Sequence, residues 1–138
     1  MGAGISHETE AFLDRFDAST SDPTVDLDQL FVEPFLALDP TSVHALTPAV
    51  LAQVLPARRA MFAKAGVGKL VRRGATESSV DDIHRLVTVE WTADRGALPE
   101  LTLRSSFLLR QEAGRLRIVV YLNHANVQTL LAAEPSGR

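Results

Sequence analysis

Few side chains in this sequence have the type and spacing needed for chemistry. The four histidines, His7, His44, His84 and His124, form no i, i+4 pair and no grouping with carboxylates that would hold a metal ion. His124 lies at the end of the last predicted strand, where a neutral imidazole with a pKa near ~6.5 could act as a general base or could be an ordinary strand-end histidine. No serine, histidine and acid stand at a spacing typical of covalent catalysis. We therefore predict no metal site, no cofactor and no recognisable catalytic constellation.

Trp91, Tyr121 and Asn123 are the best candidates for contacts to a small molecule. A three-residue turn in the last hairpin would place Tyr121 opposite Ser105 and Asn123 opposite Leu103 on one face of the sheet. Such a face is an apolar wall with a few polar groups, which is the usual composition of a ligand pocket. The alternative is that the aromatic residues belong to the core and that their polar tips are bonded there. A slip of one residue in this register would turn the opposite set of side chains toward the pocket.

Length and composition are those of an ordinary globular domain. With 138 residues, 46% of them hydrophobic and 22% charged, the chain is expected to form a single domain over residues 1–138, with an ordered core over about 6–133 and flexible ends. The net charge of −3 argues against nucleic acid as a partner. No apolar stretch approaches the ~20 residues that span a bilayer, which argues against a membrane partner. The N-terminus lacks the pattern of a secretory signal, so we expect a cytoplasmic protein.

Helical patterns occupy the first half of the chain. Ser6 is a good N-cap for a first helix, in which Phe12 and Phe16 follow at helical spacing. Thr47 before Pro48 is the start signal of a second, long helix, because proline at the first helical position loses no hydrogen bond. The expected segments are a helix over 6–18, a short helix over 25–30, a partly extended stretch over 31–38, a turn at 39–40 and a long helix that Gly66 ends.

Strand patterns occupy the second half. The expected segments are strands over 69–79, 83–93, 101–110 and 116–125, followed by a short helix that Asn126 caps and a fraying tail over 134–138. Short links between these strands predict an antiparallel meander. Charge complementarity in its first hairpin favours a register in which Glu77 is opposite Arg85 and Arg72 is opposite Glu90.

The last strand is apolar on both of its faces. Its run from Ile118 to Leu122 contains only aliphatic residues and one tyrosine. In an antiparallel sheet this pattern usually means that both faces are covered. Since the helices can cover only one face, we expect a second copy of the chain to cover the other and to form a symmetric homodimer.

This order of elements, with a tryptophan late in one strand and the final strand from Arg117 to His124, resembles the nuclear transport factor 2-like superfamily. That superfamily includes the SnoaL-like polyketide cyclases and the ketosteroid isomerases. The resemblance covers about residues 6–127 and is one of pattern rather than motif. It implies an α+β, cone-shaped fold, in which N-terminal helices pack on a curved antiparallel sheet and leave an apolar pocket at the open end. Many bacterial members are dimers, and the 12 arginines against two lysines are typical of a GC-rich bacterial genome.

The catalytic residues of the isomerases carry over poorly to this chain. Those enzymes have an aspartate base beside a proline, a tyrosine on the first helix and a second acid on a late strand. Asp39 beside Pro40 matches the first feature, but the first helix has Phe16 where a tyrosine is wanted, and residues 101–110 include no acid.

We therefore interpret the chain as a pocket-containing domain that binds a small hydrophobic or polar-aromatic molecule. The expected ligand contacts are Phe16, Trp91, Ser105, Tyr121 and Asn123. One alternative is a SnoaL-like isomerase, cyclase or dehydratase acting on a carbonyl compound, with Asp39 or His124 as the base. A second alternative is a dimeric interaction module whose pocket is filled by its own side chains.

Overall fold

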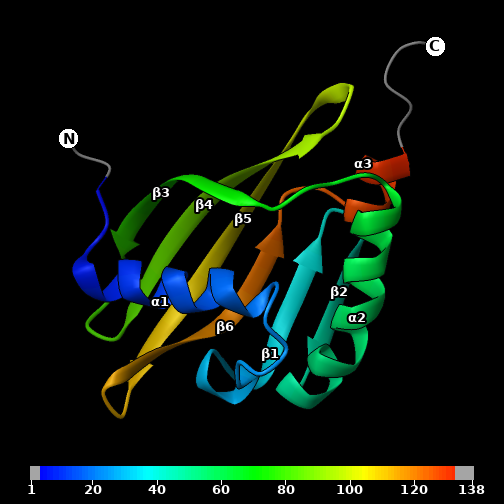
Figure 1. Cartoon of the computed structure of the whole chain (residues 1–138). Coiled ribbons are helices and arrows are strands. Elements are labelled where there is room, and N and C mark those ends of the chain that lie inside the picture. The colour runs from blue at the N-terminus through cyan, green and yellow to red at the C-terminus, as the bar shows by residue number, and fades with distance from the viewer. Residues whose placement is uncertain (1–3, 133–138) are drawn as a thin grey trace.

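The computed structural model describes residues 4–132, which form three α-helices, one 3-10 helix and a six-stranded sheet (Figure 1). The elements are α1 (His7–Ser19), η1 (Leu27–Gln29), β1 (Phe31–Asp39), β2 (Ser42–Leu46), α2 (Pro48–Lys64), β3 (Val71–Ser79), β4 (His84–Arg95), β5 (Leu98–Glu112), β6 (Arg115–Asn123) and α3 (Val127–Ala132). The strand order is β2-β1-β6-β5-β4-β3. This architecture confirms the α+β cone. The predicted fraying of residues 134–138 concerns a segment outside the described residues.

The helices begin where their capping residues predict. Ser6, Thr47 and Asn126 each accept a hydrogen bond from the backbone N–H three residues later, at 3.2, 3.2 and 2.9 Å. Each cap satisfies an amide that has no partner inside its helix. Pro48 occupies the first turn of α2, as expected. The helix predicted over 25–30 is wrong in type, because only the single 3-10 turn of η1 forms there.

Strands β1 and β2 form a hairpin that widens the predicted meander into a mixed sheet. Asp39 pairs with Ser42 at its turn, and the pairing continues to Phe35 and Leu46. The other edge of β1 pairs with β6 in the parallel direction, for example through Ala37 and Tyr121. Extended chain was expected in β1, but β2 was missed, because its five residues are all half-buried or exposed and so lack a strong alternating pattern.

The predicted register of the last hairpin is wrong by two residues. Tyr121 pairs with Phe107 and not with Ser105, while Asn123 pairs with Ser105 and not with Leu103. One residue of the shift arises at the turn, where Glu112 pairs with Arg115 across two residues instead of three. The second arises at a bulge beyond Leu108. Because the total shift beyond the bulge is even, Tyr121 and Asn123 still point to the predicted face.

The predicted register of β3 and β4 is also wrong by two residues near the turn, where Ser79 pairs with Arg85. Glu77 lies opposite Val87, and yet it forms the expected ion pair with Arg85 at 3.3 Å along the diagonal. The predicted Arg72 to Glu90 pair does not form. A bulge after Arg72 places it opposite Trp91 and turns it toward α1.

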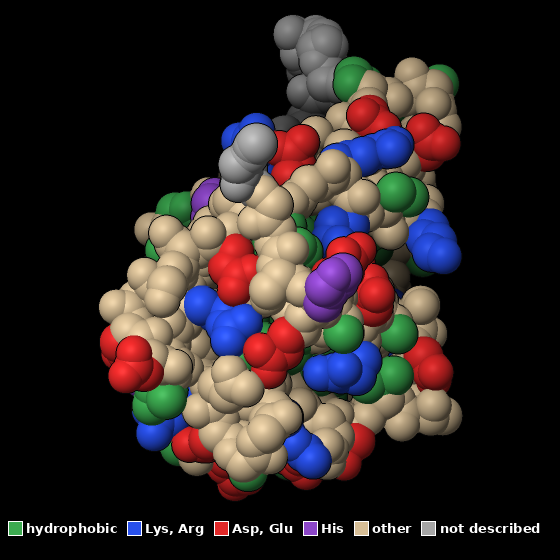
Figure 2. Space-filling view, turned by 90° about the vertical axis from the view of Figure 1, so that its left-hand side faces the viewer, with side chains coloured by type: hydrophobic (Ala, Val, Ile, Leu, Met, Phe, Trp, Pro, Cys, Tyr) green, Lys and Arg blue, Asp and Glu red, His purple; other side chains and the backbone are tan. Residues whose placement is uncertain are grey.

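Helix α1 lies across one face of the sheet, and α2 runs beside β1 and β2 (Figure 1). The apolar stripe of α1, at Phe12, Leu13 and Phe16, is buried against the sheet. Each fully buried side chain of this size contributes roughly 1.5–3 kcal/mol relative to exposure. On the side where α1 begins, acidic and basic side chains are interspersed over the surface (Figure 2).

Candidate functional site

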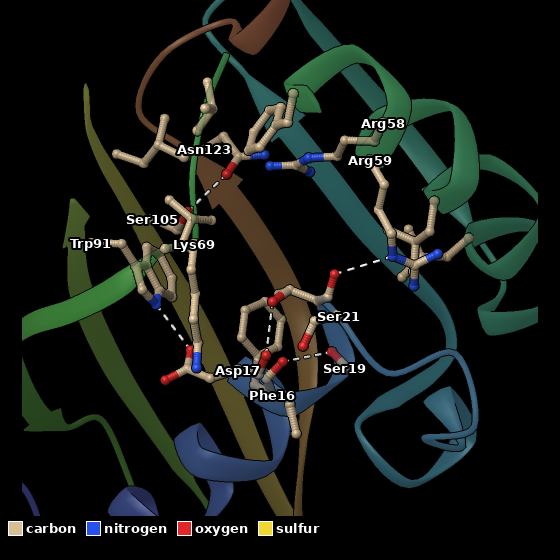
Figure 3. A pocket seen from close by; sticks show the side chains of 18 of the residues that line it. Phe16, Asp17, Ser19, Ser21, Arg58, Arg59, Lys69, Trp91, Ser105 and Asn123 are labelled. Carbon is tan, nitrogen blue, oxygen red and sulfur yellow. Dashed lines mark hydrogen bonds between the residues drawn. The ribbon is translucent and has the colours of Figure 1, made fainter. Parts of the chain in front are cut away.

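A cavity of about 660 Å³ lies between the second half of α1, the inner side of α2 and the helix-covered face of the sheet (Figure 3). This volume falls in the range of roughly 300–1,000 Å³ that is typical of small-molecule sites. A cone filled by its own side chains would have no space of this size. The cavity therefore supports the interpretation of the cone as a pocket over the alternative of a self-filled module.

Aromatic rings form the floor of the cavity. Phe16, Phe31, Trp91 and Tyr121 line it, and Phe107 lies beneath them, fully buried. The ring of Phe16 is 4.9 Å from that of Phe107 and 5.9 Å from that of Tyr121 between centroids. These separations and tilted geometries are favourable for aromatic pairs. The floor is thus rigid and apolar, and it offers a ligand a wide contact area.

All of the residues expected to contact a ligand line this cavity: Phe16, Trp91, Ser105, Tyr121 and Asn123. They come from α1, β4, β5 and β6, so the fold brings together side chains that are far apart in the chain. Their contact with a ligand stays a prediction.

Asp39 and His124, the two candidate bases, lie outside the cavity lining. Asp39 accepts hydrogen bonds from the backbone N–H and the hydroxyl of Thr41, both at 2.8 Å, and these bonds lower its pKa below the ordinary value. His124 is exposed, and its Nε2 lies 2.8 Å from the hydroxyl of Ser106. Neither side chain is placed to act on a molecule in the cavity.

A carboxylate that was not among the predicted site residues, Asp17, lines the cavity beside Trp91. The indole Nε1 of Trp91 donates to Asp17 Oδ1 at 2.9 Å, and Arg72 donates to Oδ2 at 2.6 Å. Arg72 also donates to Asp14 at 2.8 Å. Burial raises the pKa of Asp17 above its ordinary value, and the bonds from Trp91 and Arg72 offset part of that rise. Asp17 follows Leu13 by four residues and so shares the buried side of α1, and this spacing was the signal in the sequence that could have marked it as a cavity residue.

Two polar residues of the sheet are locked together in the cavity wall. Ser105, only 2% exposed, donates its hydroxyl hydrogen to Asn123 Oδ1 at 2.7 Å. This bond orients the amide, so that its Nδ2 donor is left for another partner. Tyr121 also lines the cavity.

Helix α2 presents one continuous stripe to the cavity, made of Leu51, Leu55, Arg58, Arg59, Phe62 and Ala63. These positions follow the i, i+4, i+7, i+8 pattern of a single helix face. Figure 3 shows the guanidinium group of Arg58 reaching from α2 toward Asn123 on the sheet, away from the Asp17 and Trp91 pair. The helix was predicted from its start at Thr47 and Pro48 and its end at Gly66, and the two arginines on this face were not among the predicted site residues.

The described part of the chain contains no cluster of three or more histidines and acids that could hold a metal ion. None of the helices described in residues 4–132 is both long and apolar enough to cross a bilayer.

No family model and no curated protein matches the sequence. The structure, in contrast, is similar to solved bacterial proteins. A protein of unknown function from Shewanella oneidensis, described as NTF-2 like, is 12% identical over 85% of this chain and 96% of its own, with a TM-score of 0.64. A protein of unknown function with a cystatin-like fold from Nostoc punctiforme is 14% identical over 91% and 96% of the two chains, with a TM-score of 0.65.

A ketosteroid isomerase-like protein from Erwinia carotovora atroseptica is 16% identical over 85% of this chain and 89% of its own, with a TM-score of 0.58. Identities this low carry no information about substrate or reaction. The agreement extends over most of both chains in each comparison, and it shows that this protein has the fold of the nuclear transport factor 2-like domains.

Proposed function

We propose that this domain binds a small, largely apolar molecule in the cavity of its cone. The observation that supports the proposal most directly is the composition of the cavity, an aromatic floor with polar groups at its sides, among them Asp17, Ser105 and Asn123. Binding sites for small molecules combine apolar area with a small number of oriented polar groups in this way. A catalytic role would have to use Asp17 in place of Asp39 or His124, because Asp17 alone of these three lines the cavity.

The proposal can be tested with a neutral apolar dye, N-phenyl-1-naphthylamine, and the fluorescence of the protein. Trp91 is the single tryptophan of the chain and lines the cavity, so a dye bound there quenches its emission by energy transfer. We expect saturable binding of one dye per chain. Native mass spectrometry of the purified protein, recorded in parallel, would give the mass of any molecule that the cavity retains.

Two alanines of α2 provide a matched pair of variants. Ala63 lines the cavity, whereas Ala60, on the same helix and also exposed, does not. Ala63→Phe places a ring in the ligand volume and should weaken dye binding by about tenfold or more, since it removes the apolar contact area of the ligand. Ala60→Phe should leave binding unchanged. Absence of saturable binding to the wild type, or equal effects of the two variants, would refute the proposal.

We also propose that the outer face of the sheet forms a homodimer. On this face Leu86, Leu108, Val120 and Leu36 are paired across four neighbouring strands and make a continuous aliphatic row. Leu86 and Leu36, at the two ends of the row, are 43% and 42% exposed. A row of this kind on an uncovered sheet face is suited to a second copy with the same row, related by a twofold axis.

Leu108→Asp tests the dimer, because it would place an unpaired charge at the centre of the row. We expect the wild type to be dimeric and the variant monomeric when light scattering measures their molar masses after size-exclusion chromatography. Ala11→Glu, on the exposed side of α1, is the control and should remain dimeric. A wild-type monomer would refute the proposal, as would a dimer that survives Leu108→Asp with unchanged affinity.

A further inference from the structure

The cavity is lined by more cationic than anionic side chains. Three cationic side chains, Arg58, Arg59 and Lys69, line it against the carboxylates of Asp14 and Asp17. Both carboxylates are paired with Arg72, at 2.8 and 2.6 Å. Both carboxylates therefore already have a cationic partner, and Arg58, Arg59 and Lys69 take no part in that pairing.

Arg58 is the cation best placed to meet a ligand. Its guanidinium group forms no hydrogen bond or ion pair with any residue in the described part of the chain, whereas the Nε of Arg59 donates to the carbonyl of Thr20 at 3.1 Å. The guanidinium carbon of Arg58 lies 5.5 Å from the ring centroid of Phe62, which holds the side chain in place by a cation–π contact. Arg58 is half-buried on the cavity stripe of α2, so its charge is less screened than that of a surface arginine.

A second donor faces the same corner of the cavity. Because Asn123 Oδ1 accepts the hydroxyl hydrogen of Ser105, the Nδ2 group of Asn123 is the end of the amide that points toward the cavity. In Figure 3 the side chain of Asn123 extends toward the guanidinium of Arg58, while Asp17 and Trp91 lie on the other side of the cavity. Two oriented donors next to an aromatic floor form a binding site for a planar anionic group.

We propose that the cavity ligand is an amphipathic carboxylate, with its acid group bound by Arg58 and by Asn123 Nδ2 and its apolar body on the floor formed by Phe16, Trp91 and Tyr121. The inference rests on the proposed function and specifies the ligand class. A guanidinium group and a carboxylate match each other in shape and charge, and their hydrogen bonds are among the strongest that proteins form. A single negative charge suits the site better than two, because the Asp17 carboxylate shares the cavity.

Three probes of equal chain length separate the head group from the apolar body: decanoate, decan-1-ol and decylammonium, each below its micelle concentration at pH 7.5. Trp91 fluorescence and isothermal titration calorimetry would measure their dissociation constants. We expect decanoate to bind about tenfold or more tightly than decan-1-ol, which is the minimum that a charge-assisted hydrogen bond contributes. Decylammonium should bind most weakly.

Arg58→Gln and Asn123→Asp should each abolish this preference. The second variant is the sharper test, because Asn123→Asp retains the acceptor for Ser105 and converts only the donor into a negatively charged oxygen. Arg15→Gln is the matched control, since Arg15 lies on the exposed side of α1 outside the cavity lining. Thermal melts of all variants would show that each is folded.

The outcomes distinguish the two proposals. A wild-type preference for decanoate that both variants lose and Arg15→Gln retains would support the carboxylate ligand. Equal affinity for decanoate and decan-1-ol, or stronger binding of decylammonium, would overturn this inference and leave the small-molecule pocket intact. Binding of the neutral dye without binding of any decyl compound would likewise overturn only the inference. Failure of the dye and of all the probes would overturn both proposals.

Discussion

Replacement of Phe107 by alanine should cost roughly 4 kcal/mol of unfolding free energy. Phe107 is 0% exposed, and its ring lies 4.9 Å from the ring of Phe16 and 5.3 Å from that of Tyr121. Truncation of a buried phenylalanine typically costs about 3–5 kcal/mol, the sum of lost transfer free energy and the cost of the void. The void lies beside the cavity, where the lining rings can relax only in part, so we expect a loss near the middle of this range.

Urea denaturation, followed by Trp91 fluorescence and far-UV circular dichroism, measures this loss. With an m-value of about 2 kcal/mol/M, typical for a small domain, the midpoint should fall by about 2 M. Phe62→Ala is the chemically identical control, because the Phe62 ring is only partly buried on the cavity stripe of α2, and its loss should be at most about half as large. A loss below about 1.5 kcal/mol for Phe107→Ala, or equal losses for the two variants, would refute the central place of Phe107 in the core.

Two further predictions concern the ends of the helices. Burial acts to raise the pKa of Glu77, but hydrogen bonds from Ser6 and the charge of Arg85 outweigh this effect, so the folded pKa lies below the ordinary value of 4.5. Ionised Glu77 therefore adds stability above about pH 4.5 that is lost as the pH falls through the folded pKa. Glu77→Gln should lower the melting temperature at pH 7 and leave it nearly unchanged at pH 3, and an equal decrease at both pH values would contradict this sign. Thr47→Ala removes the N-cap bond from the Val50 backbone N–H and should lower the free energy of unfolding by about 1 kcal/mol, as measured by urea denaturation. An unchanged free energy of unfolding would contradict this prediction.

The helices and most strands were predictable because their signals are local. The Ser6 and Thr47 caps each involve a backbone amide three residues away, and that distance is fixed once a helix begins. The alternation of apolar residues in β4 and β5 likewise shows which face is buried without knowledge of the partner strand. Strand β2 was missed because the burial of a short outer strand depends on its neighbours and not on its own pattern.

The predicted ligand contacts came to line the cavity although the registers used to derive them were wrong. In the last hairpin, Ala113 and Gly114 take positive φ values of 53° and 77°, which produces a two-residue turn that the sequence did not reveal. The bulge beyond Leu108 adds a second offset of one residue. The two offsets together preserve the face of Tyr121 and Asn123, and a single one would have reversed it.

The sequence alone determined the α+β class, the helix starts and the apolar faces of β4 and β5, since all of these follow from side-chain periodicity and capping within a few residues. The tertiary structure alone decided which polar groups share the cavity. Asp17 and Arg58 belong to helices about forty residues apart in the chain, and neither has a local motif that marks it as functional. Their places depend on how α1 and α2 pack on the sheet, because packing depends on the combined shape of surfaces formed by distant segments.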